Sequence, residues 1–224
     1  MSNTMKTIIF IVSLFTFLLF FILINTIIAP EVILDSPNAA LLAALLYISA
    51  YITAMYSQAL MKYLYTKKRM KALNIIKVLP AKSFELRDRL IILVLPIIAI
   101  FMPMVRKREV TAENLWSIAY LAALALIIEV LFLMNSRTLK AYVTDKGFAI
   151  NGIDFRLELS IPFSYSNAVG WYPFDRIENY LALSNKVLLY QTYDMGVITL
   201  ECSEDDVKQI TGLLVSKKIP ERRY

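Results

Sequence analysis

The chain has 224 residues, 58% of them hydrophobic, and 24 Lys and Arg against 18 Asp and Glu give it a formal net charge of +6. A soluble domain is about half apolar, so this excess of apolar residues, which is gathered in blocks, predicts membrane-embedded segments. The absence of His and the single cysteine, Cys202, exclude an intramolecular disulfide and a thiolate metal site and remove the commonest general base.

Apolar runs dominate the first 136 residues and predict a membrane all-α region of four transmembrane helices, paired as two hairpins. An uncharged helix of about 20 residues crosses a hydrocarbon core of about 30 Å. The third run is shorter and contains two prolines, so a re-entrant element is the alternative to a full span there. The predicted spans are residues 7–29, 38–61, 90–105 and 115–134.

A basic segment, residues 62–89, lies between the two predicted hairpins and contains nine Lys and Arg against two carboxylates. Short loops rich in Lys and Arg stay on the cytoplasmic side of a membrane. Lys6 before the first span and Arg137 after the last one favour the same side. These positions require four crossings, and they predict a multi-pass protein of the cell membrane with both termini in the cytoplasm.

The apolar spacing over residues 64–79 predicts that this basic segment begins with an amphipathic helix, which Pro80 ends. Its cations either set the membrane topology alone or also contact anionic headgroups, each contributing on the order of 1 kcal/mol at most. The candidate lipid contacts are Lys67, Lys68, Arg69, Lys71 and Lys77.

From residue 137 to residue 224 the sequence changes to the alternation of a soluble, cytoplasmic, β-rich domain. Turn signals, among them Asn151–Gly152, separate six or seven predicted antiparallel strands, including one over FRLELSIPF. Ser203 is the predicted N-cap of a closing helix, because three carboxylates follow it and suit the helix dipole. The apolar face of that helix comprises Val207, Ile210, Leu213 and Leu214. We expect residues 138–224 to fold alone.

Residues 142–219 resemble a bacterial and archaeal PH-like domain that is found fused to transmembrane helices. The resemblance rests on YVTDKGFAINGI, YPFDRIENYLALSNKVLLY and VITLECSEDDVKQITGLLVSKKI. It implies a β-rich PH-like fold with one capping helix over about a third of the chain. Members of this group mostly lack an assigned activity, so the resemblance implies a fold and no chemistry.

Glu129 is the one ionisable residue well inside a predicted span. A carboxylate at that depth is costly and indicates a functional role unless a polar partner stabilises it. Lys62 and Gln58, near the cytoplasmic end of the second predicted span, are at a similar depth. We interpret the three residues as a structural polar group, with a role of Glu129 in transport as the alternative.

Four aromatic residues gather in the most irregular part of the β-rich domain. Core packing accounts for most such clusters, and the alternative is a partner-binding surface, because Trp and Tyr dominate the hot spots of interfaces. Cys202 precedes the predicted helix, a position that lowers a thiol pKa, but we expect it to be inert. The four aromatic residues are Trp171, Tyr172, Phe174 and Tyr180.

Catalytic and cofactor motifs are absent from the sequence, so we expect no enzyme activity, cofactor, metal or nucleic-acid partner. The sequence favours an integral membrane protein whose cytoplasmic domain binds an unknown protein partner or the anionic headgroups of the bilayer. The alternatives are an accessory subunit of a transporter or channel and a membrane immunity protein. A homo-oligomer is compatible with each of these functions.

Overall fold

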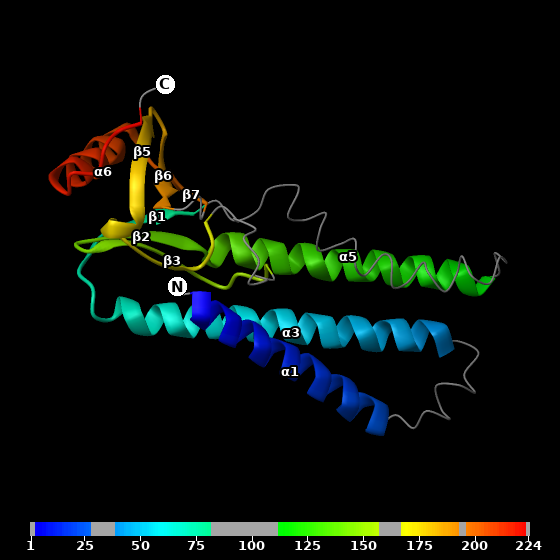
Figure 1. Cartoon of the computed structure of the whole chain (residues 1–224). Coiled ribbons are helices and arrows are strands. Elements are labelled where there is room, and N and C mark those ends of the chain that lie inside the picture. Colours follow the sequence, from blue (N-terminus) through cyan, green and yellow to red (C-terminus); the bar gives the residue numbers. More distant parts are fainter. Residues whose placement is uncertain (1–2, 28–38, 82–111, 157–166, 193–195, 223–224) are drawn as a thin grey trace.

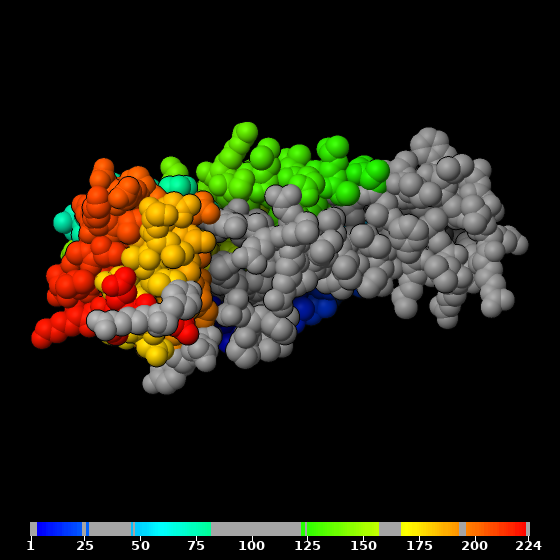
Figure 2. Space-filling view, turned by 90° about the horizontal axis from the view of Figure 1, so that it is seen from above, coloured from blue at the N-terminus to red at the C-terminus, as the bar shows by residue number. Residues whose placement is uncertain are grey.

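The computed structural model describes residues 3–27, 39–81, 112–156, 167–192 and 196–222. A β-domain forms one end of the molecule, and two long helices extend from it (Figure 1). These helices are α3 (Ala39–Met70) and α5 (Ala112–Thr138). A further helix, α1 (Asn3–Ile27), packs obliquely against α3 (Figure 1). Seen from above, α5 runs along one side of the molecule beyond the β-domain (Figure 2).

One face of helix α3 has a buried stripe that changes from apolar to mainly polar residues along the helix. Ile48, Met55 and Ala59 pack with Ile128 and Phe132 of α5, and this contact holds the two long helices together. The stripe then continues with residues of a different kind under the β-domain. These buried residues are Lys62, Thr66 and Met70. Their spacing of four residues places them on one helix face, so α3 supports both α5 and the strands.

Over its described residues, the β-domain contains seven strands in two antiparallel sheets. The first sheet has the order β1-β2-β3-β4 and the second the order β5-β6-β7. An isolated bridge between Ala81 and Leu200 joins the end of β1 to β7. The strands are β1 (Ile75–Pro80), β2 (Lys140–Thr144), β3 (Gly147–Asn151), β4 (Gly170–Pro173), β5 (Ile177–Leu183), β6 (Lys186–Gln191) and β7 (Val197–Glu201).

Helix α5 lies in the chain between two neighbouring strands, β1 and β2. These strands pair in antiparallel register, with Pro80 opposite Lys140 and Leu79 opposite Ala141. The chain therefore leaves the sheet and returns to it at adjacent points, as it does in a hairpin. In the chain order, residues 82–138 therefore take the place of the short loop that joins the two strands of an ordinary hairpin.

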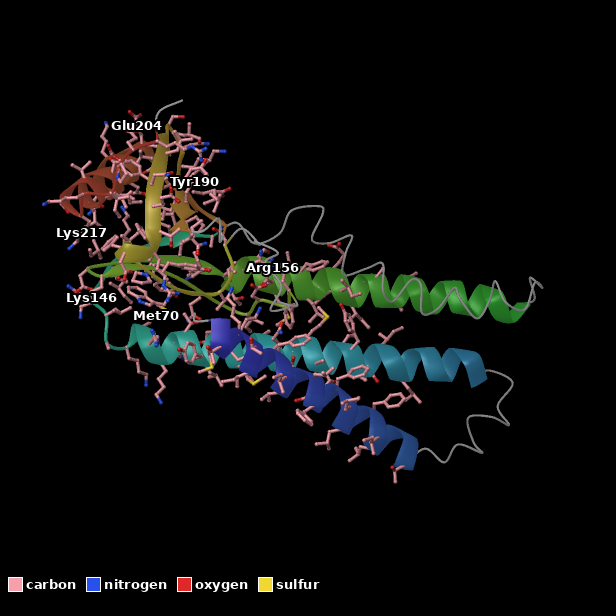
Figure 3. The ribbon with its side chains drawn as sticks, viewed as in Figure 1. Met70, Lys146, Arg156, Tyr190, Glu204 and Lys217 are labelled. Atoms are coloured by element: carbon pink, nitrogen blue, oxygen red, sulfur yellow. The ribbon has the colours of Figure 1, made fainter. Side chains whose placement is uncertain are left out.

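The core of the β-domain lies between the two sheets and is closed by α6 (Glu204–Ser216). Alternation in the strands places Val143, Ile150 and Leu189 inside, where they meet Leu214 of α6. The opposite face of the first sheet contacts α3, which approaches β3 and β4. Figure 3 shows Met70 at the domain end of α3, beneath the strands. The first sheet is thus covered on both faces.

The predicted closing helix is confirmed. Ser203 accepts a hydrogen bond from the Asp206 main chain, and the Asp206 side chain accepts one from the Ser203 main chain, which completes a capping box. Val207, Ile210 and Leu214 are buried on the predicted apolar face.

The expected architecture of four transmembrane helices in two hairpins is wrong. The described chain has four helices and two antiparallel sheets, and α6 belongs to the β-domain. Among the described residues, one stretch, Thr4–Leu23 of α1, is long and apolar enough to cross a membrane. The prediction failed because α3 continues past the expected membrane boundary to support the sheet. A multi-pass arrangement is therefore not supported, and the predicted span 90–105 lies outside the described residues.

Two local predictions also need correction. The amphipathic helix expected over residues 64–79 ends at Met70, and β1 begins at Ile75. The first sheet thereby takes a strand from outside the expected range 137–224. The hairpin expected at Asn151–Gly152 is not made over the described residues that follow, because residues 153–156 turn toward α3 without strand structure. The rest of the strand predicted there lies outside the described residues.

Candidate anion-binding groove

An open groove of about 560 Å³ lies where α3 and α5 reach the β-domain. Its floor is the outer face of β2 and β3, and its walls are the last turns of α3 on one side and the end of α5 on the other. The segment that follows β3 closes one end. The lining residues are Tyr63, Lys67, Met70, Lys71, Ile75, Arg137, Thr138, Lys140, Tyr142, Asn151, Gly152 and Ile153.

The groove is strongly basic. Lys67 comes from the last turn of α3 and Lys71 follows the end of that helix, and Arg137 and Lys140 face them from the end of α5 and the start of β2. The described residues that line the groove include no carboxylate. Within the described part of the chain, Lys71, Arg137 and Lys140 form no ion pair. Four cations held together without a counter-charge attract an anion from solution or from a membrane surface.

Two tyrosines lie among these cations. The Tyr63 hydroxyl accepts a hydrogen bond from Lys67 Nζ at 3.2 Å, and the same ammonium lies 5.3 Å from the centre of the Tyr63 ring. Burial, with a smaller contribution from Tyr63, raises the pKa of Tyr142 above its ordinary value. Tyr142 therefore keeps its proton at neutral pH and adds a hydroxyl donor to the groove.

The groove begins where the apolar outer surface of the helices ends. Leu64 is the last strongly exposed apolar residue of α3, and Lys67 follows within one turn. On α5, Leu133 and Met134 are exposed and Arg137 follows within one turn. Both helices thus change from an apolar to a basic surface near the end that meets the β-domain.

Gly152 forms part of the groove wall and brings the main chain close to the end of α5. Its φ of +155° lies in the range that favours glycine, and a Cβ atom there would lie 2.6 Å from the Leu139 Cα atom and the Thr138 oxygen. The Thr138 hydroxyl accepts a hydrogen bond from the neighbouring Ile153 N–H at 3.2 Å. These contacts fix the end of α5 against the strand that carries Asn151.

Beside the groove, a buried ionic cluster joins α3 to the β-domain. Lys62, which is 1% exposed, donates a hydrogen bond to the Arg156 main-chain oxygen at 2.9 Å, and its ammonium lies 3.8 Å from Asp154 Oδ2. Asp154 also accepts bonds of 2.9 Å from Nε and Nη2 of Arg156. Figure 3 shows Arg156 where the strands meet α5. A carboxylate faced by two cations is well satisfied despite its burial.

The electrostatics of Asp154 reflect this arrangement. Burial acts to raise the pKa of its carboxyl, but the Arg156 guanidinium, the Lys62 ammonium and the hydrogen bonds from Arg156 outweigh burial and lower it from 3.8 to about 2. The carboxylate is therefore ionised at every physiological pH. The role of Asp154 is structural, because its carboxyl does not change its protonation state near neutral pH.

The cluster reaches the second sheet through Asn167. Arg156 Nη2 donates to the Asn167 main-chain oxygen at 2.8 Å. The Asn167 side chain in turn bonds both main-chain groups of Thr199 on β7, at 2.8 and 3.0 Å. Asn167 has a φ of +56°, a conformation that asparagine tolerates better than most residues. A continuous set of polar contacts thus runs from α3 to β7.

The predicted lipid contacts fall in different places. Lys67 and Lys71 line the groove, whereas Lys68 and Arg69 are exposed outside it. Lys77 belongs to β1 and forms an ion pair with Asp206 of α6. The hydrogen bond from Lys77 is the main reason that the pKa of Asp206 is lowered. Lys77 therefore connects β1 to the closing helix.

The predicted polar group of the helices is divided in the structure. Lys62 and Gln58 are buried on α3, and the hydrogen bond and ion pair described above join Lys62 to Arg156 and Asp154. The Glu129 side chain is exposed on α5. A structural pairing of Glu129 with Lys62 or Gln58 stays a prediction.

The four aromatic residues do not form an exposed cluster. Tyr172 and Tyr180 are buried in the core, and Trp171 is half-buried on β4. The Phe174 ring meets the Phe148 ring edge-on at 5.5 Å and packs against the core. Core packing thus accounts for most of this group, and the partner-binding surface stays a prediction.

The thiol pKa of Cys202 is shifted in the direction opposite to the one that its position before a helix predicts. Burial and then the Asp206 carboxylate raise the pKa of its thiol, and the thiol donates to the Leu200 oxygen at 3.5 Å. A raised pKa suits an unreactive thiol.

The sequence predictions missed several groove and cluster residues: Arg137 and Lys140 as groove cations, Tyr142, Asn151, Asp154 and Arg156. One signal could have revealed the last two, because Asp154 and Arg156 have opposite charges and alternate with the apolar residues Ile153, Phe155 and Leu157. No protein-family model matches the chain, and neither the curated proteins nor the solved structures compared with it give a match.

Proposed function

We propose that this is a non-enzymatic protein of the cell membrane whose β-domain binds anionic phospholipid headgroups at the cytoplasmic face. Helix α1 anchors the chain in the bilayer, and the apolar outer surfaces of α3 and α5 contact lipid. The β-domain serves as a reader of the membrane surface, fixed to the helices by α3 rather than suspended on a linker.

The observation that carries this proposal is the basic groove at the level where both helices lose their apolar surface. Exposed apolar side chains cover α1 and α5, and Leu19 of α1 and Leu126 of α5 are 65% and 68% exposed. Apolar surfaces of this kind require lipid or a partner. If lipid covers them, the groove opens into the headgroup layer, where anionic phosphates are concentrated.

The experiment measures lipid binding by the full-length protein in a mild, neutral detergent. Fluorescent short-chain phosphatidylglycerol is titrated, and its anisotropy reports binding at 50 and 300 mM NaCl. We expect the affinity for the lipid to fall as the salt concentration rises, because salt screens the attraction between the groove cations and the lipid phosphate.

The groove variant replaces Lys71, Arg137 and Lys140 by Gln. Each cation near an anionic group contributes on the order of 1 kcal/mol, so the variant should bind about 10- to 100-fold more weakly. The charge-matched control replaces Lys68, Arg69 and Lys146, which are exposed outside the groove, by Gln. The proposal is wrong if the control loses as much affinity as the groove variant, or if the unmodified protein does not bind the anionic lipid.

A further inference from the structure

One polar side chain in the groove lacks a partner. Asn151, at the end of β3, is 6% exposed, and its Oδ1 atom is buried without a hydrogen bond. Its main chain is in register with Lys140 of β2, and both side chains line the groove. A buried acceptor without a donor is costly, and an apolar residue of similar size would avoid that cost. A ligand that supplies a hydrogen-bond donor at this point would remove the deficit.

The charge around Asn151 defines what the ligand can be. A phosphate offers mainly acceptor oxygens, so it suits Lys71, Arg137 and Lys140 but does not satisfy the Asn151 oxygen. Choline has no N–H or O–H donor. Ethanolamine and serine headgroups have an ammonium donor, which four surrounding cations repel. A hydroxyl on an uncharged head is the donor that fits.

The opposite orientation of the Asn151 amide would leave an NH₂ group without an acceptor. The NH₂ end of an amide is the positive end of its dipole, so the basic groove disfavours it there. The same field favours the oxygen at this position, which is buried at the groove wall.

We propose that the groove selects a phospholipid in which the phosphate carries an uncharged, hydroxylated head, with glycerol as the simplest case. The cations bind the phosphate, and Asn151 accepts a hydrogen bond from a headgroup hydroxyl. This inference rests on the proposed function, because it assumes that the groove binds a lipid phosphate. It adds a basis for selecting among anionic lipids, which charge alone does not provide.

The test compares short-chain phosphatidylglycerol, phosphatidic acid and phosphatidylserine with matched acyl chains, each titrated into the full-length protein in mild detergent. We expect the unmodified protein to bind phosphatidylglycerol about 10-fold more tightly than the other two, as one good hydrogen bond provides. Asn151→Leu should reduce the affinity for phosphatidylglycerol to that for phosphatidic acid and leave phosphatidic acid binding unchanged. Asn151→Ala provides a second variant if the leucine does not fit.

The matched control is Asn179→Leu, because Asn179 Oδ1 on β5 is likewise buried without a partner but lies outside the groove. This variant should keep the preference for phosphatidylglycerol. Equal affinity for all three lipids, with no effect of Asn151→Leu, would overturn the selectivity and leave headgroup binding intact. Binding of none of them would overturn both. Displacement of the lipid by millimolar glycerol 3-phosphate at equal affinity would make the ligand a soluble anion and overturn the assignment to lipid.

Discussion

The ammonium of Lys62 lies 2.9 Å from the main-chain oxygen of Arg156, and this buried hydrogen bond joins α3 to the segment after β3. The carboxylate of Asp154 forms an ion pair with both the Lys62 ammonium and the Arg156 guanidinium. The position of the β-domain on α3 therefore depends on a polar contact inside the protein. Two predictions concern this cluster.

Asp154→Ala should destabilise the protein more than Lys62→Met. Removal of Asp154 takes away the carboxylate that faces both buried cations, which costs about 3–5 kcal/mol in such sites. Lys62→Met leaves Asp154 paired with Arg156 and fills the space with an apolar side chain of similar length, so its cost is smaller. Thermal unfolding in detergent, followed by tryptophan fluorescence, checks the order. The exposed control Lys68→Met should stay within about 0.5 kcal/mol. The reverse order of the first two variants would contradict the described role of Asp154.

The same carboxylate should make the protein sensitive to acid. Because its pKa is about 2 in the folded chain against 3.8 ordinarily, the stabilisation is complete above about pH 4 and is lost as pH falls through about 2. The loss attributable to this group is about 2 kcal/mol. Denaturant unfolding between pH 6 and pH 2 measures it. Asp154→Asn should be less stable at pH 6 and should have a shallower acid slope. A slope identical to that of the unmodified protein would show that other groups govern acid unfolding.

Gly152→Ala should lower the free energy of unfolding, by about 1–3 kcal/mol, because the added Cβ meets main-chain atoms of Thr138 and Leu139 and the φ angle disfavours alanine. Gly212→Ala is the matched control. Gly212 lies in α6 with no atom within 4 Å of the added Cβ, so alanine there should stabilise the helix by about 0.5–1 kcal/mol. Opposite shifts of the melting temperature are expected for these two substitutions. A destabilised Gly212→Ala would contradict the described exposure of that helix face.

The pairing of β1 with β2 makes a prediction about fragments. Residues 138–224 lack β1 and its core residues Leu79 and Ala81, so we now expect this fragment to lose cooperative unfolding. A chain that begins at residue 72 and replaces residues 82–138 by a four-residue Gly- and Asn-rich turn should restore it, because Pro80 and Lys140 are paired neighbours. Circular dichroism melting compares the two. Equal, sharp melting of both would show that β1 is dispensable.

Local patterns explain which parts of the fold could be predicted from the sequence. The N-cap at Ser203 and the apolar spacing of α6 depend on residues close in the chain, and both predictions are confirmed. The turn between β5 and β6 is equally local, because Ser184 and Asn185 alone separate the paired residues Leu183 and Lys186. These signals need no distant partner.

The strand β1 could not be recognised in the same way. Leu73, Ile76 and Leu79 have helical spacing and follow a basic helix, so the local pattern favoured a continued helix. The partner that makes this segment a strand, β2, lies about 60 residues further along the chain. Pairing across the sheet therefore overrides local propensity here.

The groove was only partly predictable for a similar reason. The density of basic charge indicates Lys67 and Lys71, but in the sequence Arg137 has the signature of a topology signal and Asn151 that of a turn residue. These four side chains come from three separate parts of the chain, which meet only when α5 returns to the sheet beside α3. A charge that sets orientation and a charge that binds a ligand look the same in a sequence.

The position of α5 between β1 and β2 has a consequence for synthesis of the protein. The ribosome completes β1 before α5 exists, and β1 has no partner strand until residues 140–144 have been made. The first sheet cannot close until the chain has passed through α5 and reached β2, so closure of this sheet waits for the synthesis of α5. A chain whose α5 does not return to the sheet would leave β1 exposed as an unpaired edge, which marks the failed product for aggregation or degradation.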